Sequence, residues 1–311
     1  MQTTAGAAAA SSLAGDLMTL RADPLNMPIG LQLYTVGPDM QKDFDGTLKK
    51  IADIGYKAVE GASLASFQNK SAADLAKSFS AVGLKCSSAH VVQTTMSTDE
   101  LAKLIEFCHG LGLDFMVCAT AQFGPPAGPP DPNMTSDQRR SAAAARLDKL
   151  TADDFKKVAD QFNAIGTQVT KAGINFAYHN HAMEFKAFAD GSTGFDVLVQ
   201  SSDKSVVNYE LDCGWCTYAG QDPVALLKKY AERIKMLHVK DQKSGYPPTI
   251  GFGGAPTTEV GKGIVDWKAV FQAAKSAKIK HYFVEQEPPF SEMPAIDAIK
   301  VSYDYLHSLK V

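Results

Sequence analysis

Glycines followed by short apolar runs recur along the chain and suggest a repeated unit. The segments before the first three have apolar residues at helical spacing, over 44–54, 71–82 and 97–111. Each glycine is expected to end its helix in the left-handed conformation, which other residues avoid, and to open a strand. The four runs are Gly55-YKAVE, Gly83-LKCSSAH, Gly112-LDFMVCA and Gly173-INFAYH. The pattern therefore predicts strands that alternate with helices.

The rest of the chain continues this alternation. Strands are expected near residues 31, 58, 87, 116, 176, 208, 237 and 283, and the later helices over 151–171, 193–201, 222–231, 266–277 and 294–308. Eight strand–helix units imply a parallel sheet closed into a (β/α)8 TIM barrel. A doubly wound open sheet is the alternative, but no GxGxxG follows a strand. The Pro/Gly-rich segment 121–150 is expected to overhang the active face, as a lid or an oligomer contact.

Composition limits the partners that the protein can take. The 311 residues are 45% hydrophobic, which is enough for one large core or two modest ones. The formal net charge is −3 and the basic residues are scattered, so we expect no nucleic-acid partner. No run of about 18 apolar residues occurs, so no membrane-spanning helix is predicted. A small-molecule substrate is the expected partner, and a homodimer is the expected assembly because barrels of this size often pair.

The chain has five cysteines at irregular spacing, which does not indicate a disulfide framework. Cys213-Gly-Trp-Cys216 forms a CxxC, as a redox pair or half of a zinc site would. It has no second CxxC, and it does not open a helix after an N-terminal strand as a thioredoxin-like motif would. We therefore interpret these cysteines as structural.

Residues 1–27 differ in composition from the predicted domain, which covers 28–311. The stretch TTAGAAAASSLAG resembles the hydrophobic part and small-residue cleavage region of a twin-arginine export signal without its arginine pair. A disordered Ala-rich tail is the alternative. The interpretation as a signal remnant predicts an exported, periplasmic protein.

Polar side chains gather where the predicted strands end. Because active sites of TIM barrels lie at the carboxyl ends of the strands, these residues are candidates for chemistry. They are Gln32 and Tyr34, Glu60, His90, His179 and His181, Glu210 and Asp212, His238 and Lys240, and Glu285 and Glu287. Carboxylates that converge with neutral histidines would repel one another without a cation. Mixed oxygen and nitrogen ligands suit Mn²⁺, Co²⁺, Mg²⁺ or Zn²⁺.

Several motifs in this order resemble the sugar phosphate isomerase/epimerase family, the xylose isomerase-like TIM barrels. They are IGLQLYTV, YHNHAMEF, YELDCGW, HVKD, GKGIVDW and FVEQE, and the resemblance covers about residues 28–309. It implies a divalent metal held by Glu, Asp, His and Glu from strands five to eight. Asp212, His238 and Glu285 match the last three residue by residue. The first has no clean match: His179 stands at the strand end, and Glu184, the predicted ligand, follows five residues later.

The resemblance implies proton transfer on a keto or aldo sugar through an enediolate, which makes an isomerase or epimerase. Glu184, Glu287 and His179 are the candidate proton carriers, and Lys240 is expected to neutralise the enediolate or bind a hydroxyl. Side chains expected to bind the sugar are Tyr34, Glu60, His90, His181 and Trp215.

Two other functions use the same rim of the barrel. A 3-keto-glycoside lyase or hydratase would eliminate a leaving group from the same intermediate, and an exported protein favours it because phosphorylated sugars are rare outside the cytoplasm. A non-catalytic sugar-binding protein would need the hydrogen-bonding rim but no metal. A DNA-repair endonuclease of the superfamily is disfavoured, because it would need more histidine ligands and a basic face.

Overall fold

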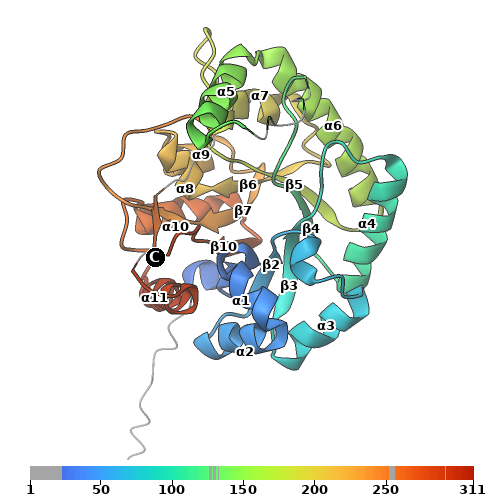
Figure 1. The fold of residues 1–311 in the computed structure, drawn as a ribbon, viewed down its shortest axis with the longest axis vertical. Helices are drawn as coiled ribbons and strands as arrows, with labels where there is room; N and C mark the ends of the chain where they lie inside the picture. Colours follow the sequence, from blue (N-terminus) through green and yellow to red (C-terminus); the bar gives the residue numbers. More distant parts are fainter. Residues whose placement is uncertain (1–22, 126–127, 129–130, 132, 252–255, 291) are drawn as a thin grey trace, which may run out of the picture.

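Eight parallel strands close into a barrel, which confirms the predicted TIM barrel and excludes the open sheet. The structure, a computed structural model, describes residues 23–311 except 126–127, 129–130, 132, 252–255 and 291. Around the barrel the strands follow the order β1, β10, β7, β6, β5, β4, β3 and β2 (Figure 1). Their bounds are β1 Gly30–Gln32, β2 Ala58–Gly61, β3 Lys85–His90, β4 Phe115–Cys118, β5 Asn175–His179, β6 Asn208–Asp212, β7 Ile234–Val239 and β10 His281–Val284.

The predicted helices form the outer layer (Figure 1). They are α2 Phe44–Ile54, α3 Ala72–Ala81, α4 Thr98–Leu111, α6 Ala152–Lys171, α7 Gly194–Ser201, α9 Pro223–Lys229, α10 Trp267–Ala277 and α11 Ala295–Ser308. Gly112 ends α4 with φ 78°, as the repeat predicts. The sequence did not predict α1 Gly37–Lys42, α5 Ser136–Lys149, α8 Cys213–Tyr218 or the short 3-10 turns η1 Pro24–Asn26, η2 Leu33–Val36, η3 Ala65–Phe67 and η4 Met183–Phe185.

The interior of the barrel changes from apolar to polar along the strands. One buried cluster fills its lower part and consists of Ala58, Phe115, Val117, Ala177, Met236 and Phe283. Side chains on a strand alternate, so the residues two positions further along point to the same interior. These are Glu60, His179, His238 and Glu285, all of them buried. The apolar layer therefore supports a polar layer at the end of the barrel that carries the carboxyl ends of the strands.

Two irregularities in strand pairing precede the deepest carboxylates. The register between β2 and β3 shifts between Val59 and Glu60. The register between β6 and β7 shifts between Tyr209 and Glu210. Bulges of this kind bend a strand and change the direction of its side chains. Here the two shifts come directly before Glu60 and Glu210, which belong to the polar layer.

The carboxylate of Asp241, the last residue of the HVKD motif, binds the segment that contains the GKGIVDW motif. Asp241 lies in β8 Asp241–Gln242, which pairs with β9 Thr257–Thr258 as a small antiparallel ribbon. Its buried carboxylate accepts hydrogen bonds from the backbone N–H groups of Gly261, Gly263 and Val265 at 2.9, 3.2 and 3.1 Å, and from the indole of Trp267 at 2.9 Å. Asp241 thus holds the segment before α10 in place.

The cysteines are all free and buried. Burial raises the pKa of Cys213 and Cys216 well above the ordinary thiol value, and buried protonated thiols are inert. These two residues lie on α8, which follows β6 and not an N-terminal strand as in a thioredoxin-like motif. Their burial agrees with a structural role.

The last residues of the predicted N-terminal tail pack on the barrel. The hydroxyl of Tyr282 donates to the carbonyls of Pro24 and Met27 at 3.2 and 3.1 Å, and His307 contacts Asp23 at 2.7 Å. The predicted export signal lies in residues 1–22, outside the described residues. Among the described helices, none combines the length and the apolar character that crossing a membrane requires.

Candidate active site

A pocket of about 360 Å³ opens at the carboxyl ends of the strands. Its lining residues are Gln32, Tyr34, Ala62, His90, His179, His181, Trp215, Lys240, Glu285 and Glu287. Eight of these are predicted site residues; Gln32 was among the strand-end candidates without an assigned role, and Ala62 is additional. Gln32 ends β1, so its place at a strand end was the signal for it. Ala62 carried no such signal.

Below the pocket, carboxylates and imidazoles alternate in a buried polar layer. Glu60 Oε2 lies 2.6 Å from His238 Nε2, 3.0 Å from His90 Nε2 and 2.8 Å from Gln32 Nε2. Glu210 Oε2 lies 2.9 Å from His90 Nε2 and 3.2 Å from His179 Nδ1. Burial opposes charge on His90, but the carboxylates of Glu60 and Glu210 outweigh it and raise its pKa to about 9.

Glu60 was predicted to bind the sugar, and the structure corrects this. It is fully buried and does not line the pocket. Burial alone would raise the pKa of Glu60, but the charges of His90 and His238 hold it well below its usual value. Glu60 therefore positions these two imidazoles from beneath and does not meet a ligand in the pocket.

Asp212, His238 and Glu285 meet at the base of the pocket, as their places at strand ends predict. His238 Nδ1 lies 3.0 Å from Glu285 Oε2 and 3.8 Å from Asp212 Oδ2. His179 Nε2 lies 3.8 Å from the same Asp212 oxygen. Asp212 Oδ1 caps α8 by accepting from Trp215 N at 2.7 Å. The other oxygen, Oδ2, is buried and accepts no hydrogen bond among the described residues.

These donors fit a divalent cation. Their ligand atoms lie within 4.8 Å of one another, and the set mixes carboxylate oxygen with imidazole nitrogen. Asp212 Oδ2, whose close charged partner is the Lys240 ammonium at 2.9 Å, is an atom that a cation would contact. A second group of the same kind joins His90, His179, Glu210 and His238 in the layer beneath.

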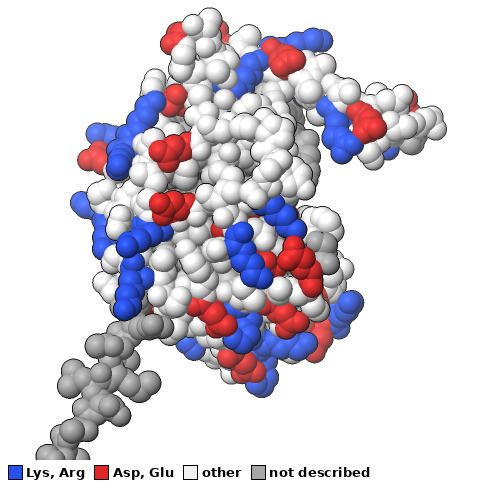
Figure 2. Space-filling model, turned by 90° about the vertical axis from the view of Figure 1, so that its left-hand side faces the viewer, with Lys and Arg blue, Asp and Glu red and all other residues white. Residues whose placement is uncertain are grey.

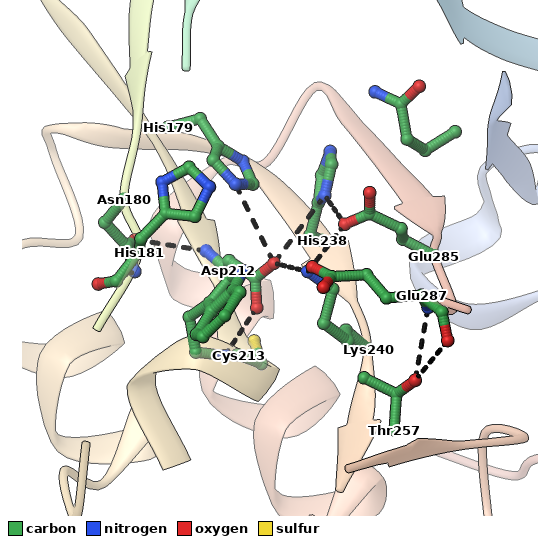
Figure 3. A network of polar contacts seen from close by, with 12 residues as sticks. His179, Asn180, His181, Asp212, Cys213, His238, Lys240, Thr257, Glu285 and Glu287 are labelled. Atoms are coloured by element: carbon green, nitrogen blue, oxygen red, sulfur yellow. Dashed lines mark hydrogen bonds and ion pairs between the residues drawn. The ribbon is translucent and has the colours of Figure 1, made fainter. Parts of the chain in front are cut away.

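Lys240 lies at the pocket as its strand-end position predicts, but the sequence did not predict its ion pairs. Its ammonium lies 2.9 Å from Asp212 Oδ2, 2.8 Å from Glu285 Oε2 and 2.7 Å from Glu287 Oε1 (Figure 3). Burial opposes its charge, yet the three carboxylates raise its pKa well above the ordinary value. Lys240 thus supplies positive charge at the oxygens that a metal would use.

Glu184, the predicted first metal ligand, belongs to neither group of metal-capable residues. It lies in η4, where one carboxylate oxygen accepts from the hydroxyl of Tyr178 and the other from His181 N at 2.9 Å. Glu184 also does not line the pocket. Burial raises its pKa to about 7, against the effect of these hydrogen bonds. The correction leaves His179 as the residue of β5 that faces Asp212.

Two of the three histidines that line the pocket, His179 and His181, have lowered pKa values. Burial lowers the pKa of His181 to about 3, and the charge of Lys240 adds to the effect. Burial also lowers the pKa of His179, with a further contribution from the charge of His238. Neutral imidazoles suit hydrogen bonding or metal ligation.

Trp215 also faces the pocket and is 5% exposed. The Lys240 ammonium lies 5.0 Å from its ring centroid, and the His181 ring lies 5.4 Å away. Its indole N–H is buried and has no hydrogen-bond partner among the described residues. The pocket thus offers an aromatic face and one unused donor.

The chain belongs to the xylose isomerase-like TIM barrel family, whose model matches residues 48–308. Two inosose dehydratases are similar in sequence. That of Geobacillus kaustophilus is 26% identical over 206 residues, which cover 63% of this chain and 61% of the relative. That of Clostridium beijerinckii is 28% identical over 148 residues, 44% and 49% of the two chains. The matches thus span about half to three fifths of the relatives' length.

Solved structures share the fold across nearly the whole chain. A sugar phosphate isomerase/epimerase from Parabacteroides distasonis has a TM-score of 0.69 at 24% identity, with 90% of this chain and 93% of the other covered. The IOLI protein, solved with a zinc atom, has a TM-score of 0.65 at 16% identity, with 89% and 96% covered. This likeness shows that the chain shares their fold.

Proposed function

We propose that the protein is a metal-dependent lyase that removes a proton beside the ketone of a keto-sugar or keto-cyclitol and eliminates a group from the next carbon. The observation that carries the proposal is the Lys240–Glu287 pair, 2.7 Å apart, on the wall of a sugar-sized pocket. The carboxylate can take the proton, and the ammonium can stabilise the negative charge that forms. Similarity to inosose dehydratases supports the same chemistry.

The bonds change in a balanced way. The C–H bond next to the ketone breaks, its electrons form a carbon–carbon double bond, and the C–O bond to the leaving group breaks. The proton removed by Glu287 passes to the leaving oxygen, which departs as water or an alcohol. No oxidant or reductant is needed.

Elimination needs one base, whereas epimerisation needs a proton carrier on each face of the carbon. Glu287 stands on one side, and the histidines on the other wall, His179 and His181, have lowered pKa values and are poor bases. Glu184, the other carboxylate considered, lies outside the pocket. A single base supports the lyase above an epimerase. An isomerase, which also needs only one base, remains the second candidate together with the epimerase because of the structural relative.

His179, Asp212, His238 and Glu285 would hold the metal. When bound, it would polarise the ketone and stabilise the enolate. The chain's own groups bind and orient the substrate: the Trp215 indole can donate to a sugar oxygen and its ring can cover an apolar sugar face. Tyr34, which is 49% exposed at the mouth, can contact the outer hydroxyls. The zinc atom in the structure of the IOLI protein supports a metal site in this protein. Manganese as the metal remains a prediction.

The test is incubation with 3-keto-glucosides and an inosose in deuterated water, with Mn²⁺ supplied. The proposal predicts release of the aglycone or of water and an unsaturated ketone as product. Deuterium incorporation without elimination would favour the isomerase or epimerase. If no substrate shows elimination or deuterium incorporation, the remaining interpretation is a non-catalytic sugar-binding protein. Export to the periplasm and a homodimer also remain proposals.

A further inference from the structure

We propose that a second cavity beside the sugar pocket binds a large apolar aglycone, so that the substrate is a keto-glycoside and not a free sugar. This inference rests on the proposed function and narrows its substrate class. The cavity has a volume of about 880 Å³, more than twice that of the sugar pocket. We call it the aglycone cavity; its main apolar lining comes from Phe123, Ala142, Ala143, Leu147, Leu150 and Met183.

The aglycone cavity continues from the same strand ends as the sugar pocket. Its floor includes Gln93 and Thr120, which form a bridge that extends β3 and β4. Gln93 follows the pocket residue His90 by three positions, and Met183 follows the pocket residue His181 by two. Both cavities are thus lined by residues close to the ends of β3 and β5, and the proposal takes the substrate to span them.

The roof of the cavity is α5, a helix with little packing of its own. Leu147 is its one buried residue, although the helix has 14 residues. Helices in proteins gain most of their stability from packing an apolar face against the rest of the fold. With one buried residue, α5 has little of this stabilisation. Ala142, Ala143 and Leu147 turn toward the cavity instead. A ligand beneath α5 would supply the missing apolar partner.

The charged groups of the lining are engaged by the loop itself, so they do not call for a charged ligand. Arg146 donates to the carbonyl of Pro125 at 2.8 Å, and Arg139 donates to that of Met134 at 3.0 Å. Asp131 accepts from Asn133 N at 2.9 Å. The larger, apolar part of the lining therefore points to an apolar group in the cavity. An aromatic aglycone meets these requirements, and pockets of 300–1,000 Å³ bind ligands of this size.

The test compares methyl and 2-(2-naphthyl)ethyl 3-keto-β-D-glucosides, whose leaving groups are both alkyl alcohols of similar acidity. Wild-type protein is expected to show a kcat/KM about 10-fold or more higher for the naphthyl substrate, because the cavity buries the rings. Ala143→Trp fills the cavity and should abolish this preference while the methyl substrate is turned over as before. Ala144→Trp is the matched control, since Ala144 is exposed on the same helix and does not line the cavity.

Equal kcat/KM values for the two substrates in the wild type would overturn the inference. A preference for the naphthyl substrate that Ala143→Trp leaves unchanged would also overturn the inference. This holds even if the variant has a different oligomeric state. If neither keto-glucoside nor an inosose reacts, the proposed function fails, and calorimetry with 2-naphthyl β-D-glucoside decides on the cavity. Binding that Ala143→Trp weakens and Ala144→Trp does not would support the cavity; no binding would refute it.

Discussion

Replacing Lys240 by methionine tests whether the ammonium stands in for a metal. The substitution keeps the length of the side chain and removes a charge that lies within 2.9 Å of three carboxylates. At an effective dielectric constant of about 20, each such contact is worth on the order of 5 kcal/mol before desolvation. Burying the ammonium offsets much of this, and losing one partner from a buried ion pair costs about 3–5 kcal/mol net.

In the presence of EDTA, we therefore expect Lys240→Met to lower the Tm by about 6–10 °C. Added Mn²⁺ should restore the stability, because a cation can replace the ammonium between Asp212 and Glu285. Without the competing ammonium, the variant should also bind Mn²⁺ about 10-fold more tightly than wild type. Differential scanning fluorimetry and calorimetric titration measure these two effects.

The matched control is Lys243→Met, the same change a few residues further along. Lys243 pairs with Glu292 at 3.0 Å in a partly exposed position, and such pairs are worth less than about 1 kcal/mol. If Lys240→Met were no less stable than Lys243→Met in EDTA, the ammonium would not hold the carboxylates together. If Mn²⁺ stabilised Lys240→Met no more than wild type, the shared site would be refuted.

Three further predictions follow from the same geometry. Asp212→Asn should lower the metal content of purified protein at least 10-fold with the far-UV circular dichroism unchanged, and an unchanged metal content by mass spectrometry would remove Asp212 from the ligand set. Glu287→Gln should reduce kcat about 100-fold or more, because it removes the proposed base. The Mn²⁺ affinity should change little, because the proposed metal ligands are kept. Near-normal turnover would exclude Glu287 as the base. Glu184 has a folded pKa of about 7, raised by burial, so its stabilising contribution is present below about pH 4.5 and is lost as the pH rises toward 7. Glu184→Gln should flatten this fall, on the order of 3 kcal/mol between pH 4.5 and 8 in urea unfolding, and identical pH profiles would show that the carboxylate is already ionised in the fold.

The repeated glycine pattern predicted the barrel because one local rule recurs in every unit. A helix ends at a left-handed glycine, such as Gly83 with φ 71° or Gly173 with φ 81°, and a buried strand follows. The helix α5 escaped this pattern because it has one buried residue and therefore shows little apolar periodicity. The short helix α8 was missed because CGWCTY carries no helical spacing, and its N-cap, Asp212, was considered only as a ligand.

Strand alternation brought Asp212, His238 and Glu285 to one place, since all three end neighbouring strands of the barrel. It failed for Glu184, because η4 begins after β5 and turns this side chain back to Tyr178. The contacts of Lys240 depend on residues at the ends of two other strands, β6 and β10, and no local pattern contains them.

The surface adds one check on the proposed partners. In Figure 2, acidic and basic side chains intermingle over the visible face and form no single-sign patch. A nucleic-acid backbone would need clustered positive charge. This face therefore agrees with the expectation of a small-molecule substrate.

The most direct test of the account is anomalous diffraction from crystals grown with Mn²⁺. The account predicts one strong peak bounded by Asp212, His238 and Glu285, with His179 beside it and the Lys240 ammonium moved toward Glu287. Crystals that show no manganese there, with the ammonium still between the Asp212 and Glu285 carboxylates, would contradict it.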